Sequence, residues 1–254
     1  MMRRPLIAAV LFAVALPLTA QLPGPPTRRP EVAVDTVRPP VASRQIVARR
    51  DALLPKHRII AYYGNPLSTR MGILGEIPPE QMMARLEETA KRWEAADTSR
   101  PVLRALHLIV TVAQAHPGER GLYRLQHGDA LIGKVAAWAD SRGWLLFLDV
   151  QAGRSPIAAE IPRLLPWLRR PNVHLGIDPE FAMPPGKVPG KRIGTLDASD
   201  VNQVQALLAK LVDEAGIPPK ILVVHRFTEG MPTRERDVTL DPGDAGVMDA
   251  DGAG

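Results

Sequence analysis

The sequence predicts an α/β fold of the TIM-type (β/α) barrel class, on three observations. From His57 onward, short apolar runs alternate with segments of helical periodicity, which is the pattern of a parallel sheet built from βα units. The apolar runs begin about 40 residues apart, a spacing that fits a barrel. No G-x-G-x-x-G follows any apolar run and no phosphate-binding P-loop is present, which argues against a nucleotide-binding Rossmann sheet.

Six strands are expected, each a short apolar run. They cover residues 58–64, 103–113, 144–150, 173–181, 220–227 and 246–252. A complete barrel has eight strands. Six strands therefore predict either an incomplete barrel or a chain truncated after the sixth strand, and the strand-like ending favours truncation.

Four helices are expected between these strands, over residues 78–96, 129–143, 155–168 and 197–216. The first has proline in its first turn, where the missing N–H costs nothing. Asp129 begins the second and Gly143 ends it. Prolines interrupt the third, and the fourth has Asp or Ser as its cap and Gly216 as its stop.

Three segments are predicted along the chain. Residues 1–20 resemble a secretory signal peptide, because Arg3 and Arg4 precede an apolar run of about 13 residues, too short to span a bilayer. Residues 21–56 are rich in Pro and Arg and are expected to form a linker or surface tail. Residues 57–254 form the barrel domain. We therefore expect a protein that is secreted, extracellular or held in the cell envelope, with no membrane span after cleavage.

The composition limits the partners and cofactors. The chain has no cysteine, which excludes disulfides and thiolate metal sites. The net charge is +5, but the basic residues are scattered and lack interleaved aromatics, so dedicated nucleic-acid binding is not expected. A monomer without a cofactor is predicted.

Polar side chains follow the apolar runs, where a barrel carries its reactive groups. Asp149 and Gln151 share one face of their strand because strand side chains alternate, and Asp178 and Glu180 share a face with Gly176, which leaves room beside them. Carboxylates crowded together push their pKa values apart. The candidates are Tyr62, Tyr63, Asn65, Gln114, Asp149, Gln151, Asp178, Glu180, His225, Asp249 and Asp251.

Carboxylates with one histidine and no cysteine favour glycoside hydrolysis, which needs a carboxylic acid and a second carboxylate. Glu180 is the expected general acid, Asp178 would hold it, and Asp149 or Asp249 would be the partner carboxylate. The remaining candidates are expected to bind substrate, a polysaccharide or cell-wall glycan: Tyr62, Tyr63, Asn65, Gln114, Gln151, His225 and Asp251.

Asp178-x-Glu180 at the end of a fourth strand resembles the D-x-E arrangement of some secreted barrel glycosidases, including muramidases that cleave cell walls. More broadly, the chain is similar to a group of uncharacterised exported bacterial proteins of barrel type. The motifs that carry this resemblance are RIIAYYGNPLSTRMGILGE, LDVQAG, HLGIDPEFAM and VVHRFTEGM. The resemblance implies export and the barrel fold, and it implies no settled activity.

Two alternatives stay open. A hydrolase that depends on a divalent metal would use oxygen and nitrogen ligands from Asp149, Asp178, Glu180, His225 and Asp249. A non-catalytic barrel would use the same polar groups to bind a ligand, or as a polar layer that closes the barrel. His107 and His174 lie in the middle of their strands and are expected to be core or interface histidines.

Overall fold

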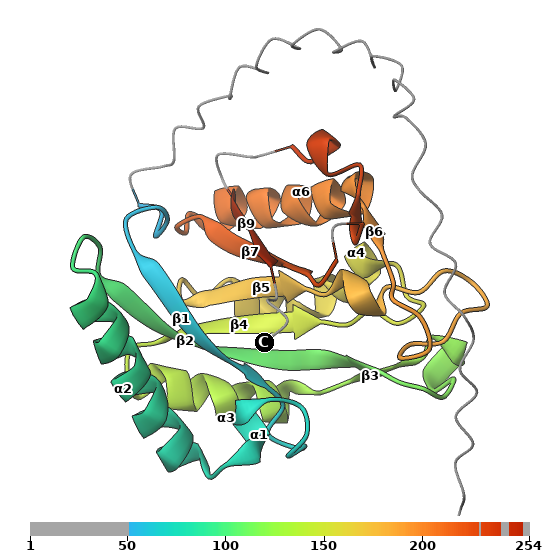
Figure 1. Ribbon diagram of the computed structural model, residues 1–254. Coiled ribbons are helices and arrows are strands. Elements are labelled where there is room, and N and C mark those ends of the chain that lie inside the picture. Colours follow the sequence, from blue (N-terminus) through green and yellow to red (C-terminus); the bar gives the residue numbers. More distant parts are fainter. Residues whose placement is uncertain (1–50, 229, 240–243, 251–254) are drawn as a thin grey trace, which may run out of the picture. The chain divides into compact units, whose positions relative to one another are not determined.

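The computed structural model describes residues 51–228, 230–239 and 244–250, and it has the α/β architecture expected from the sequence (Figure 1). Six parallel strands form the main sheet in the order β1-β2-β4-β5-β7-β9, and the short β3 pairs antiparallel with β2. The bounds are β1 Arg58–Gly64, β2 Val102–Ala113, β3 Arg124–Gln126, β4 Leu145–Val150, β5 Val173–Ile177, β7 Lys220–Arg226 and β9 Asp244–Ala250. A separate pair joins β6 (Leu196–Asp197) to β8 (Pro232–Thr233).

The parallel strands follow one another in chain order, without the reversal of a doubly wound sheet. Each new strand is added at the same edge, and the sheet curls into a half-barrel (Figure 1). The carboxyl ends of the strands therefore meet on one side, which is where the polar residues of the sequence were expected.

Helices connect the strands. They are α1 Ile73–Glu76, α2 Pro79–Ala96, α3 Asp129–Asp140, α4 Ile157–Glu160, α5 Leu165–Leu168 and α6 Ala198–Ala215, with 3-10 turns η1 Glu119–Gly121, η2 Pro162–Leu164, η3 Pro179–Phe181 and η4 Glu235–Asp237. The single helix expected over 155–168 is replaced by α4, η2 and α5. Pro162 and Pro166 remove backbone donors there and prevent a continuous helix.

The helix α6 has the ends that its sequence indicates. Asp197 caps it by accepting a hydrogen bond from the N–H of Ser199, and the carboxylate of Asp200 accepts one from the N–H of Asp197. Gly216 ends the helix with a positive φ of 62°, which glycine adopts without strain.

Alternation along each strand separates two faces. One face packs on the helices and forms the main core, for example through Leu106 and Leu108 of β2 and Leu146 and Leu148 of β4. The concave face is apolar near the amino ends of the strands, where Ala105, Leu145, Phe147 and Ile221 pack together with Leu53 and Leu54 from the segment expected to be linker. Toward the carboxyl ends, the concave face becomes polar.

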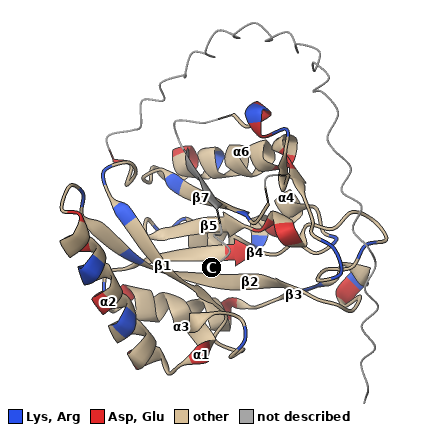
Figure 2. Cartoon of the chain, viewed as in Figure 1, with Lys and Arg blue, Asp and Glu red and all other residues tan. Residues whose placement is uncertain are grey.

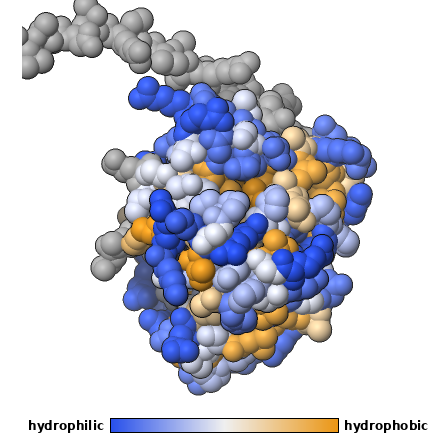
Figure 3. Space-filling model, turned by 90° about the vertical axis from the view of Figure 1, so that its right-hand side faces the viewer, coloured by the Kyte–Doolittle hydropathy of each residue, from blue (hydrophilic) through white to orange (hydrophobic). Residues whose placement is uncertain are grey.

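Acidic and basic residues are interspersed along the helices and loops (Figure 2). On the face drawn in Figure 3, apolar residues form patches separated by hydrophilic ones. No helix in the described ranges is both long enough and apolar enough to cross a membrane. The predicted signal peptide at 1–20, and the linker up to residue 50, lie outside the described residues.

Candidate functional site

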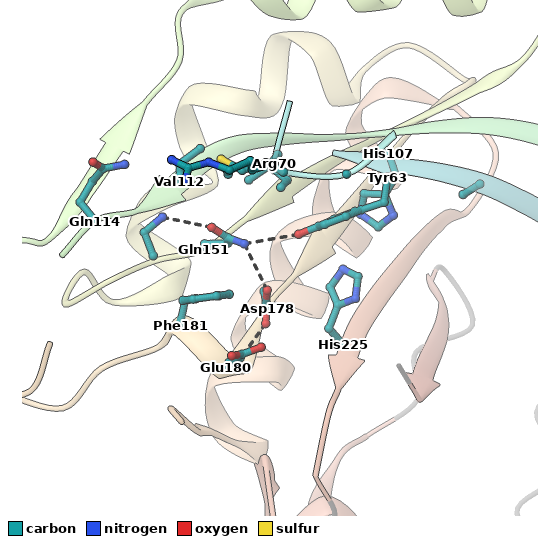
Figure 4. Close-up of a pocket in the computed structure, with 15 residues that line it drawn as sticks. Tyr63, Arg70, His107, Val112, Gln114, Gln151, Asp178, Glu180, Phe181 and His225 are labelled. Carbon is teal, nitrogen blue, oxygen red and sulfur yellow. Dashed lines mark hydrogen bonds between the residues drawn. The ribbon is translucent and has the colours of Figure 1, made fainter. Parts of the chain in front are cut away.

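A pocket of about 770 Å³ opens at the carboxyl ends of the strands, and Figure 4 shows it. Its walls come from β1, β2 and β7, from Gln151 directly after β4, from the loop before α1, and from the turn η3 after β5. The polar side chains that line it are Tyr63, Arg70, His107, Gln114, Gln151, Asp178, Glu180 and His225, and Phe181 adds an aromatic ring. Side chains far apart in the sequence therefore meet at one place.

Asp149 lies behind this wall and is fully buried. Its Oδ1 accepts hydrogen bonds from Nε2 of His107, at 3.2 Å, and from Nε2 of His225, at 3.0 Å. Its Oδ2 accepts one from the hydroxyl of Tyr63, at 3.1 Å. Burial acts to raise the pKa of Asp149, but the charge of His225 and the hydrogen bonds of both imidazoles outweigh it and hold this pKa well below its usual range.

Gly176 makes room for the buried cluster formed by His107, Asp149 and His225. It lies on β5 beside Asp149, and a Cβ at this position would stand 2.3 Å from Oδ1 of Asp149 and 2.5 Å from Nε2 of His107. Any other residue would push these two side chains apart. The inward-facing glycine noted in the sequence thus leaves space for the cluster itself.

Gln151 links the buried cluster to the pocket (Figure 4). Its Oε1 accepts a hydrogen bond from the backbone N–H of Ala113, at 3.1 Å, which fixes the orientation of the amide. Its Nε2 then faces the hydroxyl of Tyr63 and Oδ2 of Asp178, each at 3.4 Å. Gln151 therefore positions both side chains.

Asp178 is the carboxyl group of the pocket wall whose pKa is raised into the neutral range. Burial, and then the negative charge of Asp149, raise its pKa to about 7 from an ordinary value of 3.8. Its Oδ1 also accepts a hydrogen bond from the N–H of Glu180, at 3.1 Å, and so begins the turn η3.

Burial and the charges of Asp149 and Asp178 raise the pKa of Tyr63 well above its usual value, so its phenol stays protonated.

The structure brings together six of the residues selected from the sequence along the pocket wall. These are Tyr63, Gln114, Gln151, Asp178, Glu180 and His225. Asp149 accepts hydrogen bonds from two of them, Tyr63 and His225, and is itself fully buried. Asp249 lies in β9, where its backbone is the register partner of His225; its side chain and the whole of Asp251 are outside the described residues.

Two residues selected from the sequence are elsewhere. Tyr62 faces the helices, because neighbouring strand residues point to opposite sides, and its hydroxyl bonds to that of Thr89 on α2 at 3.0 Å. Asn65 is buried in the turn after β1, where Nδ2 donates to the carbonyl of Ile109 and Oδ1 accepts from the N–H of Leu67. Neither lines the pocket, and Asn65 shapes the turn.

His107 is buried, as expected of a core histidine, but it also lines the pocket and bonds to Asp149, which the sequence did not predict. His174 is a core histidine as expected, with Nδ1 accepting the N–H of Ile221 at 3.1 Å. Arg70 and Phe181, which also line the pocket, carried no signal in the sequence.

His107, Asp149 and His225 offer three donor atoms within 4.8 Å of one another, which is a ligand set that could hold a metal ion.

No family model matches the chain, and neither a curated protein nor a solved structure matches it significantly. The function must therefore be argued from the pocket.

Proposed function

We propose that this protein is a hydrolase that uses carboxyl groups to cleave glycosidic bonds. The observation that carries the proposal is Asp178, whose pKa of about 7 keeps a proton on it near neutrality, at a pocket that Glu180 also lines. Glycoside hydrolysis needs one protonated carboxyl group to donate to the leaving oxygen and one carboxylate to act as nucleophile or base.

Asp178 is the proton donor in this proposal. Glu180 was expected from the sequence to have that role, but Asp178 is more deeply buried and stands near the charge of Asp149. Glu180 then serves as the second carboxylate, which activates water or attacks the sugar. Asp149 takes no direct part, since it is not exposed to the pocket; it raises the pKa of Asp178 and orients the two histidines.

The lining of the pocket supports a sugar substrate. Gln114, Gln151 and Arg70 offer hydrogen-bond donors to hydroxyl groups, and the rings of Tyr63 and Phe181 offer apolar surface to the face of a sugar ring. The pocket volume of about 770 Å³ lies in the range of small-ligand sites. We therefore propose a polysaccharide or cell-wall glycan as the substrate.

We also propose that the sheet belongs to a TIM-type barrel and that the protein is exported. Six parallel strands in chain order, with polar groups at their carboxyl ends, support assigning the sheet to a TIM-type barrel. The sequence of residues 1–20 supports export, so the glycan would be met outside the cell or in its envelope.

The experiment measures release of reducing ends from a panel of glycans that includes peptidoglycan, with the wild-type protein, Asp178→Asn and Asp213→Asn. Asp213 is an exposed residue of α6 and gives a matched control. We expect Asp178→Asn to lower the rate by about 100-fold to 10,000-fold, the usual contribution of general acid catalysis, and Asp213→Asn to leave it unchanged. The proposal fails if the wild type releases no reducing ends, or if Asp178→Asn is as active as the wild type.

A further inference from the structure

We propose that His107, Asp149 and His225 bind a divalent cation such as Zn²⁺ at the wall of the pocket. The sequence predicts no cofactor, and the metal alternative that it leaves open uses Asp149, Asp178, Glu180 and Asp249 with a single histidine, His225. The set proposed here shares Asp149 and His225 with that alternative and adds His107. The new ligand set has two imidazole nitrogens and one carboxylate oxygen. This inference rests on the geometry of the cluster and does not depend on the proposed hydrolysis.

The spacing of the donor atoms fits coordination. Bonds of about 2.0–2.2 Å from one ion to two ligands, at the roughly 109° angle of tetrahedral zinc, place the ligand atoms about 3.3–3.6 Å apart. The Nε2 atoms of His107 and His225 lie 3.2 and 3.0 Å from Oδ1 of Asp149. A small outward shift of these side chains would therefore place an ion among them without a change in the backbone.

The cluster is held in place before any ion arrives. Its residues come from three strands of one sheet, β2, β4 and β7, and each is at least nine-tenths buried. The Tyr63 hydroxyl fixes Oδ2 of Asp149, which leaves Oδ1 as the ligand atom. Such outer partners orient metal ligands and raise their affinity.

The charge also fits. Coordination requires both imidazoles to be neutral, and in that form they and the carboxylate give the site a net charge of −1, which a buried divalent cation would more than neutralise. Nitrogen with one carboxylate oxygen suits Zn²⁺ and similar transition ions, whereas Ca²⁺ and Mg²⁺ prefer oxygen alone. A transition ion is therefore the class that this site selects.

Three protein ligands leave a further coordination position, as in catalytic rather than structural zinc sites. His107 and His225 line the pocket, so that position faces the space in which a substrate would lie. A bound ion would supply a Lewis acid there, beside Asp178 and Glu180.

The test is isothermal titration of Zn²⁺ into the full chain after dialysis against EDTA, with no substrate present. We expect one site with a Kd below about 1 µM, which weakens as the pH falls because the imidazoles must be deprotonated. His225→Gln and His107→Gln should each weaken binding by more than about 100-fold, and Tyr63→Phe by about 10-fold to 100-fold.

His116→Gln is the matched control, since His116 lies on an exposed turn, and it should leave the Kd unchanged. Nitrogen NMR of the wild type gives a second measurement that needs no variant: Zn²⁺ should shift the Nε2 resonances of two histidines and leave the other described imidazoles in place. Absence of such shifts, or binding that survives His107→Gln and His225→Gln, overturns the proposal. Asp178→Asn should still bind Zn²⁺, so failure of the metal site and failure of the proposed hydrolysis are distinguishable.

Discussion

The imidazole of His225 donates to Oδ1 of Asp149 at 3.0 Å, although strand β5 separates the strands on which the two residues lie. This contact is possible because the residue of β5 beside Asp149 is Gly176, which has no side chain to stand between them. The pocket thus depends on a hydrogen-bonded cluster built across a glycine.

Replacing Gly176 by alanine should break this cluster. The added Cβ would lie within 2.5 Å of Oδ1 of Asp149 and Nε2 of His107, so both must move. We expect a loss of about 1–3 kcal/mol in the free energy of unfolding, the usual cost of overpacking. Urea denaturation measures it. Gly133→Ala in α3 is the control, because its Cβ would meet only Trp167, at an ordinary 3.5 Å, and should be neutral or slightly stabilising. Equal effects at the two glycines would contradict this prediction.

Removing the charge of Asp149 should be more costly. Asp149→Asn leaves two buried imidazoles without their carboxylate partner, and breaking such a buried pair costs about 3–5 kcal/mol. Chemical denaturation near neutral pH should show this loss, while Asp213→Asn on the surface should change stability little. A loss below about 1 kcal/mol for Asp149→Asn would mean that the cluster contributes little to the fold.

Asp178→Asn should stabilise the protein at high pH. The folded-state pKa of about 7 is above the ordinary 3.8, so the stability linked to the bound proton is fully present below pH 3.8 and is lost as the pH rises through 7. The ionised form therefore costs on the order of 4 kcal/mol in the folded state, and asparagine avoids this cost. Denaturation of the EDTA-treated wild type and variant at about pH 4 and about pH 8 measures the difference. A difference that does not grow with pH would contradict the raised pKa.

Glu180→Gln should abolish turnover while leaving the cluster intact. Glu180 contributes its backbone N–H to Asp178, a contact that glutamine retains, so stability should change little. We expect the hydrolysis rate to fall by about 100-fold or more, as for loss of a catalytic base. Reducing-end assays beside the exposed control Glu119→Gln measure this. If both variants keep the wild-type rate, Glu180 is not the second carboxylate.

The sequence predicted the α/β alternation because apolar runs and helical periodicity are local properties. It also placed Gln151, Asp178 and Glu180 at one end of the sheet, since parallel strands end together. Whether Tyr62 or Tyr63 faces the pocket depends on strand parity, which the run of apolar residues around them does not reveal.

His107 was missed because β2 is long and its neighbours are staggered. Its register partner on β4 is Phe147, two residues before Asp149, so a residue in the middle of β2 reaches a cluster near the end of β4. That stagger is a property of the curled sheet and cannot be found in the residues of β2 alone. The prolines predicted that the helix expected over 155–168 would be interrupted. They did not predict its division into α4, η2 and α5.

Direct titration of Asp178 by carboxyl carbon NMR, on the EDTA-treated wild-type protein, tests the central claim most directly. A carboxyl group that is buried near the ionised Asp149 should titrate with a midpoint near pH 7. A midpoint below about pH 5, in the range of an ordinary aspartate, would contradict the claim that this pocket holds a proton donor at neutral pH.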